Sequence, residues 1–194
     1  MSKEVVKRDK EYRLSDIVIR SAEDDSDVLI VEGYAIVWEQ ETLIGSERYG
    51  YYETIARNAL DKAHMSDVVG RYNHNDTNYI LGRTRNKSLE LIVDDKGLKI
   101  RAKLAPTQAN KDIYTLIQNG TLDKMSYAFT VSKEEWDYDT DTRRILEIDK
   151  LYDVSVVDVP AYDSTEIYAR SKEQIEKEKE QYEANKLELE KEKL

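Results

Sequence analysis

The sequence of 194 residues contains no cysteine, two prolines, two histidines and a single phenylalanine. Without cysteine, the fold has no disulfide and no cysteine-ligated zinc site. Two histidines leave few candidates for a general base near neutral pH. The 30 basic residues are outnumbered by 40 acidic ones, which gives a net charge of −10. An acidic surface repels phosphate groups, so the composition argues against a nucleic-acid-binding protein.

Long hydrophobic runs are also missing. The first ten residues are charged and lack the apolar region of a secretory signal, and no apolar stretch reaches the length of a membrane span. We therefore expect a protein that acts in a cytoplasm and has no membrane partner. The length is sufficient for one domain with a hydrophobic core and short appendages.

β-Branched and aromatic runs dominate the first two thirds of the chain. They predict three hairpins, over residues 16–38, 88–105 and 125–159. The second hairpin is the clearest, because Asp95, Lys96 and Gly97 supply turn chemistry between two alternating stretches. Residues 67–72 and 81–84 also have strand character.

Only two helices are predicted in this region. Residues 53–64 carry apolar side chains at helical spacing, and residues 107–120 have Thr107 as a helix N-cap and Gly120 just past the end. Many short strands with two helices favour a β-rich barrel or sandwich over an alternating βαβ fold.

The composition changes abruptly at Ser171. Residues 171–194 are mostly Glu and Lys, without Gly or Pro, and predict a helix. Ile175, Tyr182 and Leu189 recur at heptad spacing, but the other seam positions are polar, so an autonomous coiled coil is not expected. A solvated helix and a segment that orders against a partner both remain open.

The stretch "KMSYAF" predicts a strand with two unlike faces. Met125 and Tyr127 lie on a large apolar face, whereas Ser126 and Ala128 lie on a small one. Ser126 is either an ordinary packed residue or a nucleophile, and a nucleophile requires a base within hydrogen-bond reach and a group that orients that base. The G-x-S-x-G elbow of α/β-hydrolases is absent.

Two further side chains are candidates for these supporting roles. His74 follows a predicted strand and precedes a polar loop, so it is either a surface histidine or a precisely placed base. Asp153 lies among apolar residues of a predicted strand, where an unpaired carboxylate is costly. Its partner is either His74 or an arginine, and Glu147 is the reserve carboxylate. Zinc-protease, calcium-loop and phosphate-loop motifs are absent, so no metal or cofactor is expected.

Several segments, taken in order, resemble the prohead (capsid maturation) proteases of tailed bacteriophages, of the HK97 type. They are "VEGYAIVW", "ETIARNAL", "NHND…LGRT", "DDKGLKIRAKL", "IQNGTLDKMSYAF" and "LYDVSVVDVPAYDSTEIYAR", and they span about Asp16 to Arg170. The resemblance implies a serine endopeptidase similar in fold to herpesvirus assemblins. That fold is β-rich α+β, a mostly antiparallel β-barrel surrounded by a few short helices.

The resemblance also implies a catalytic set. His74 stands at the histidine of the "NH" box, Ser126 at the serine of the "MS" box, and Asp153 at the acidic position before "VSVV". Many relatives have Glu in place of Asp153 and Phe in place of Tyr127. The large face would anchor the strand in the core, and the small face would leave an open groove in which Ser126 meets an extended peptide.

The predicted organisation is a flexible N-terminal segment (1–15), a protease domain (16–170) and a charged helix-prone tail (171–194). By resemblance, the enzyme is a homodimer that acts in the host cytoplasm inside the assembling prohead. It would cleave phage scaffold protein or the scaffold-like segment of the major capsid protein, and then itself. The tail is either an encapsidation helix or a solubilising end. A non-catalytic capsid-assembly or scaffold-binding protein with the same fold is the alternative.

Overall fold

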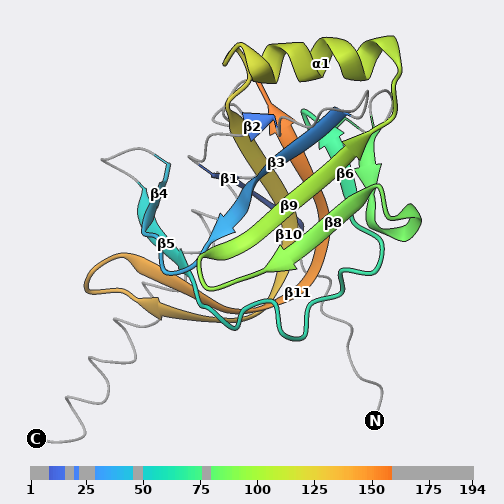
Figure 1. Cartoon of the computed structure of the whole chain (residues 1–194). Coiled ribbons are helices and arrows are strands. Elements are labelled where there is room, and N and C mark those ends of the chain that lie inside the picture. The colour runs from blue at the N-terminus through green and yellow to red at the C-terminus, as the bar shows by residue number, and fades with distance from the viewer. Residues whose placement is uncertain (1–8, 16–19, 22–28, 46–49, 76–79, 159–194) are drawn as a thin grey trace, which may run out of the picture.

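The computed structural model of the chain describes residues 9–15, 20–21, 29–45, 50–75 and 80–158. These residues form two β-sheets, one α-helix and one turn of 3-10 helix (Figure 1). The larger sheet contains β1 (Glu11–Ser15), β4 (Thr42–Ile44), β5 (Tyr51–Ile55), β6 (Val69–Tyr72), β7 (Ile80–Arg83), β10 (Lys124–Asp137) and β11 (Thr142–Val157). The smaller sheet contains β2 (Arg20–Ser21), β3 (Leu29–Val37), β8 (Leu89–Val93) and β9 (Gly97–Leu104). The helices are α1 (Gln108–Gln118) and the 3-10 turn η1 (Thr84–Asn86).

The hairpin predicted over residues 88–105 is confirmed as β8 and β9. Its turn is built by Asp94, whose Oδ1 accepts hydrogen bonds from the backbone N–H groups of Lys96 at 2.8 Å and Gly97 at 2.9 Å. A Cβ on Gly97 would lie 1.9 Å from the carbonyl oxygen of Ile36. Only glycine therefore allows β9 to approach β3 this closely.

The other two predicted hairpins are seen as β2 with β3 and as β10 with β11, both antiparallel. Residues 16–19, part of the first prediction, lie outside the described residues, as does the predicted tail at 171–194. Residues 11–15, expected in a flexible segment, form β1 and pair with β10. The folded part of the chain therefore begins before Asp16.

The helix predicted from Thr107 is confirmed as α1, with the Thr107 side chain accepting a hydrogen bond from the backbone N–H of Asn110 at 3.3 Å. The helix predicted over residues 53–64 is wrong. That segment is β5 followed by turns, and its backbone bonds to β11: the N–H of Ala56 donates to Ile145 and that of His64 donates to Asp149. Pairing with a long neighbouring strand has overridden the helical spacing.

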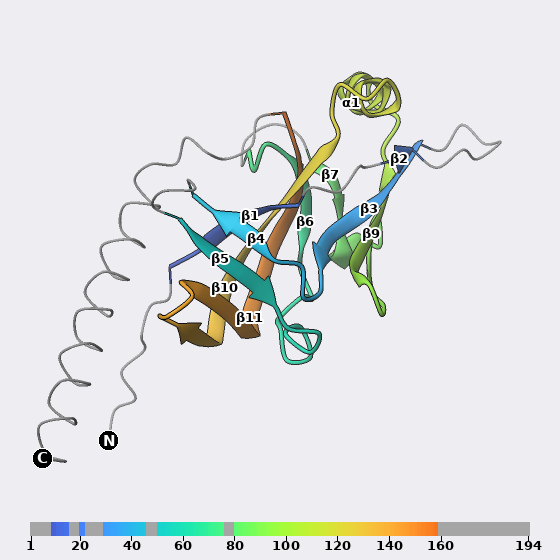
Figure 2. The ribbon, with the colours of Figure 1, turned by 90° about the vertical axis from the view of Figure 1, so that its left-hand side faces the viewer.

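The expected mostly antiparallel β-barrel is not confirmed by the described residues. β11 pairs with β10 on one side and, on the other, in parallel with both β5 and β6, so the larger sheet branches and does not close on itself. In Figure 2 the two sheets are seen side by side, with α1 at one end. Among the described residues α1 is the only α-helix, where several surrounding helices were expected.

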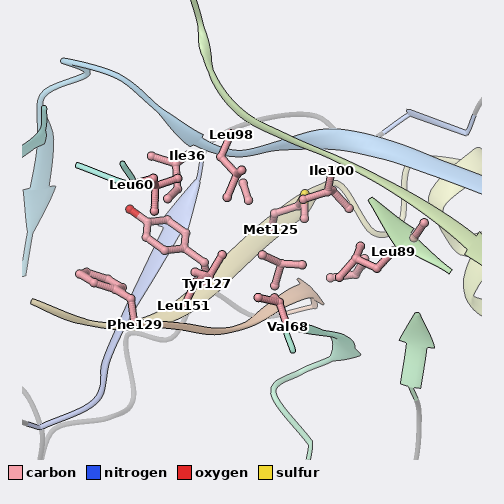
Figure 3. Packing of buried hydrophobic residues seen from close by; sticks show 14 of the residues in the cluster. Ile36, Leu60, Val68, Leu89, Leu98, Ile100, Met125, Tyr127, Phe129 and Leu151 are labelled. Atoms are coloured by element: carbon pink, nitrogen blue, oxygen red, sulfur yellow. The ribbon is translucent and has the colours of Figure 1, made fainter. Parts of the chain in front are cut away.

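The two sheets enclose one hydrophobic core. Side chains of β3 and β9 meet those of β10 and β11 there, among them Ile36, Leu98, Met125, Phe129 and Leu151 (Figure 3). Met125 and Phe129 are almost completely buried, so the large face of β10 anchors the strand as predicted. No helix in the described part of the chain is long and apolar enough to cross a membrane.

Candidate active site

Three adjacent strands of the larger sheet position the candidate residues. Ser126 on β10 lies opposite Ser155 on β11, and Asp153 on β11 lies opposite Val69 on β6. β6 ends at Tyr72, two residues before His74. The order β10, β11, β6 therefore brings the serine, the carboxylate and the histidine to the same region of the sheet.

The backbone at His74 is unusual and is held by its neighbour. Both Asn73 and His74 have a φ of 52°, in the left-handed region that non-glycine residues seldom adopt. The side-chain oxygen of Asn73 accepts a hydrogen bond from the N–H of Asp158 at 3.0 Å, and its own N–H donates to Val156. Asn73 thus ties the end of β6 to the end of β11, next to the residue that carries the imidazole.

The three predicted site residues are in contact. The Nε2 atom of His74 lies 2.6 Å from Ser126 Oγ, and its Nδ1 atom lies 2.5 Å from Asp153 Oδ1. Both distances are those of strong hydrogen bonds. Ser126 is fully buried and Asp153 is only 3% exposed. The reserve carboxylate, Glu147, is not part of this cluster, since it accepts a hydrogen bond from Lys62 at the surface.

Three further side chains support the cluster, and the sequence did not identify them. Ser155 donates to Asp153 Oδ1 at 3.0 Å and lies 3.1 Å from His74 Nδ1. The ammonium of Lys10 pairs with Asp153 Oδ2 at 3.2 Å, and the ring of Tyr12 packs edge-on against the imidazole. The sequence could have identified Ser155 as a site residue, because it shares a predicted strand with Asp153. The sequence could not have identified Lys10 and Tyr12, because they precede the segments that resemble the family.

The open groove expected beside Ser126 is wrong for this structure. Ala128, which shares the small face with Ser126, is buried, and so is Thr130 two residues further along the strand. The strand β1 runs along β10 with Leu14 opposite Ser126. The hydroxyl of Ser126 donates a hydrogen bond to the carbonyl oxygen of Arg13 at 2.8 Å. The nucleophile candidate is thus covered by the chain's own N-terminal strand.

The electrostatics of Asp153 favour the ionised carboxylate. Burial alone would raise the pKa of Asp153, but the hydrogen bond and charge of His74 and the charge of Lys10 outweigh it, so the pKa lies below its ordinary value of 3.8. An ionised carboxylate beside Nδ1 holds the imidazole in the tautomer whose Nε2 accepts a proton.

The lowered pKa of Asp153 predicts acid sensitivity. Because the folded-state pKa lies below the unfolded value, Asp153 stabilises the fold above about pH 4, and this contribution is lost as the pH falls through the folded-state pKa. We expect the free energy of unfolding, measured by urea denaturation between pH 6 and pH 3, to decrease less steeply in Asp153→Asn than in the parent. Glu147→Gln is the control, since its surface ion pair contributes little. Equal slopes in Asp153→Asn and the parent would contradict the assignment.

A hydroxyl, an imidazole and a carboxylate in series form the arrangement that serine hydrolases use for acyl transfer. The chain belongs to the caudovirus prohead serine protease family, whose model matches residues 15–181. This finding confirms the resemblance deduced from the sequence boxes.

The chain is similar to two prohead proteases. It is 37% identical over 90 residues to that of Escherichia phage T5, covering 46% of this chain and 42% of the relative. It is 28% identical over 142 residues to that of Enterobacteria phage HK97, covering 72% of this chain and 59% of the relative. The chain thus spans about half the length of these relatives. The solved structure of the bacteriophage T4 capsid assembly protease, gp21, matches 77% of this chain and 99% of its own, with a TM-score of 0.42 and 13% identity.

Proposed function

We propose that the chain is a serine endopeptidase of prohead maturation, with Ser126 as nucleophile, His74 as general base and Asp153 as the residue that orients the base. The observation that carries this proposal is the continuous contact from Ser126 Oγ through both ring nitrogens of His74 to Asp153. Membership of the prohead serine protease family supports the same chemistry.

In the proposed reaction, His74 Nε2 takes the hydroxyl proton while Ser126 Oγ attacks the scissile carbonyl carbon. The tetrahedral intermediate collapses, the C–N bond breaks, and the imidazolium gives its proton to the leaving amine. Water, deprotonated by the same ring, then hydrolyses the acyl-enzyme and regenerates Ser126. Asp153 stabilises the imidazolium throughout, and Ser155 restrains the carboxylate by its hydrogen bond.

The proposed substrates are the phage scaffold protein or the scaffold-like segment of the major capsid protein, cut within the prohead in the host and followed by self-cleavage. Family membership supports this assignment. A homodimer, a protease domain over residues 16–170 to which β1 is added, and a charged tail at 171–194 that is either an encapsidation helix or a solubilising end belong to the same proposal.

A fluorophosphonate probe tests the proposed nucleophile. We expect the probe to add covalently to Ser126, as located by mass spectrometry of the labelled peptide. Labelling should be about 100-fold slower or more in His74→Ala, because the hydroxyl then lacks its base. Labelling at another residue, or equal rates in the parent and His74→Ala, would contradict the proposal. A protein that binds scaffold protein but resists the probe even when β1 no longer covers Ser126 would be the non-catalytic assembly factor.

A further inference from the structure

The strand β1 lies where a peptide substrate would lie. It is extended and pairs antiparallel with β10, the strand that carries Ser126. The carbonyl oxygen of Arg13 is the acceptor for the Ser126 hydroxyl at 2.8 Å, which places the peptide bond between Arg13 and Leu14 beside the nucleophile. Addition of an extended segment to a strand edge is a common way for proteins to hold peptides.

The side chain of Arg13 fills a buried acidic subsite. Its Nε and Nη2 atoms donate to the two carboxylate oxygens of Glu53 at 2.6 Å and 2.8 Å, and Nη2 also donates to the hydroxyl of Tyr51 at 3.2 Å. The side chains of Arg13 and Glu53 are 11% and 3% exposed. A two-pronged, desolvated contact of this kind selects a guanidinium over a neutral side chain of the same shape.

We propose that β1 occupies the substrate's place, and that Glu53 selects a basic residue on the acyl side of the scissile bond, in the position now taken by Arg13. The inference rests on the proposed function of Ser126 and adds its specificity. Tyr12, the preceding residue, then marks the neighbouring subsite against the imidazole of His74. Arginine is preferred over lysine, because the planar guanidinium fork matches the two oxygens of one carboxylate.

The charges around the subsite support this reading. Without β1, the subsite retains the carboxylates of Glu53 and Glu134 and the guanidinium of Arg143, which leaves one uncompensated negative charge. An incoming arginine supplies a cation directly to Glu53. Glu11 of β1 pairs with Arg143 at 2.6 Å, so an acidic residue two positions before the basic one is the second feature that the site accepts.

The bound strand also restrains the resting enzyme. Ser126 has one hydroxyl proton, and the carbonyl oxygen of Arg13 accepts it in competition with His74 Nε2. Displacing β1 therefore lets the Ser126 hydroxyl donate its hydrogen bond to His74 Nε2. A substrate that resembles β1 competes for the same strand edge.

Two matched peptides test the specificity in the full chain. One carries the sequence Glu-Tyr-Arg-Leu-Ser between a fluorophore and a quencher, and the other replaces arginine with citrulline, which has the same shape and no charge. We expect kcat/KM to be about 10- to 100-fold higher for the arginine peptide, the range of a hydrogen bond to a buried charged group. In Glu53→Gln the ratio should fall below about threefold, whereas Glu32→Gln, which removes a carboxylate from the ion pairs of β3 and β9, should keep it.

Release of the strand is tested separately. Arg13→Gln should increase the rate of fluorophosphonate labelling at Ser126 severalfold, because β1 loses its anchor, and Arg101→Gln should not. The peptide comparison needs no variant, so it stands even where Glu53→Gln does not fold. Equal cleavage of the two peptides overturns the inference alone. Labelling of Ser126 without cleavage of either peptide, in both the parent and Arg13→Gln, has the same consequence. Absence of both labelling and cleavage overturns the proposed function, and the inference with it.

Discussion

Replacing Ser126 with alanine should lower peptide cleavage by about 10⁴-fold or more, to a rate close to background, because the Ser126 hydroxyl lies at His74 Nε2 whereas that of Ser155 lies at Nδ1 beside the carboxylate. The fold should survive. The substitution removes one hydroxyl, and His74 retains its contacts with Asp153 and Ser155. The loss of stability is therefore about 1 kcal/mol, the contribution of a typical hydrogen bond. Cleavage of the arginine peptide and thermal unfolding are the two measurements.

The matched control is Ser132→Ala on the same strand. Ser132 donates to the carbonyl oxygen of Glu147 and has no contact with His74 among those described. Its replacement costs a comparable hydrogen bond and should leave cleavage within about twofold of the parent. Proteolysis that persists in purified Ser126→Ala, at more than about a thousandth of the parent rate, would remove Ser126 from the role of nucleophile.

The sequence located the candidate site better than it located the surroundings of that site. Each sequence box joins a functional side chain to residues that shape the local backbone. Asn73 beside His74 is one example, because its side chain ties β6 to β11. The alternation around Ser126 similarly reflects the burial of Met125 and Phe129 in the core. Local patterns of this kind can be recognised in the sequence without knowledge of the tertiary structure.

Contacts across long stretches of chain had no such local signal. Lys10 reaches Asp153, and Arg13 reaches Glu53, although nothing in the sequence distinguishes either residue from a solvated surface charge. The segment from Glu53 to His64 was misassigned for a related reason. Its apolar residues do reach the core, as helical spacing required. Its backbone, however, bonds to the distant strand β11 at Ala56, Ala59 and His64 and forms local turns between these points. The spacing of the apolar residues predicted their burial correctly but predicted the wrong backbone hydrogen bonds.

Replacing Arg143 with methionine should destabilise the fold by about 3–5 kcal/mol, a large share of the 5–15 kcal/mol typical of a domain. The guanidinium of Arg143 is 7% exposed and donates to Glu11 at 2.6 Å, to Glu53 at 2.9 Å and to Glu134. Methionine fills the volume but removes the guanidinium that pairs with Glu134, and leaves Glu11 and Glu53 sharing the single cation of Arg13. Buried charges without partners account for most of the expected loss, which urea denaturation at pH 7 measures.

Measuring the stability of Arg143→Met at lower pH separates the contribution of charge from that of packing. Burial would raise the pKa of Glu11, but its hydrogen bond to Arg143 and the charges of both arginines lower it below the ordinary value of 4.5. Removing Arg143 takes away one of the two guanidinium groups that lower the pKa of Glu11, so this carboxyl is protonated more readily in the variant, and the gap in stability between parent and variant should narrow as the pH falls. Arg144→Met is the adjacent control. Its guanidinium is 46% exposed and pairs with Glu39, so its loss should cost less than about 1 kcal/mol at either pH. If the loss of stability in Arg143→Met is as small as in this control, or does not change with pH, the buried ion cluster does not stabilise the junction of β1, β5, β10 and β11.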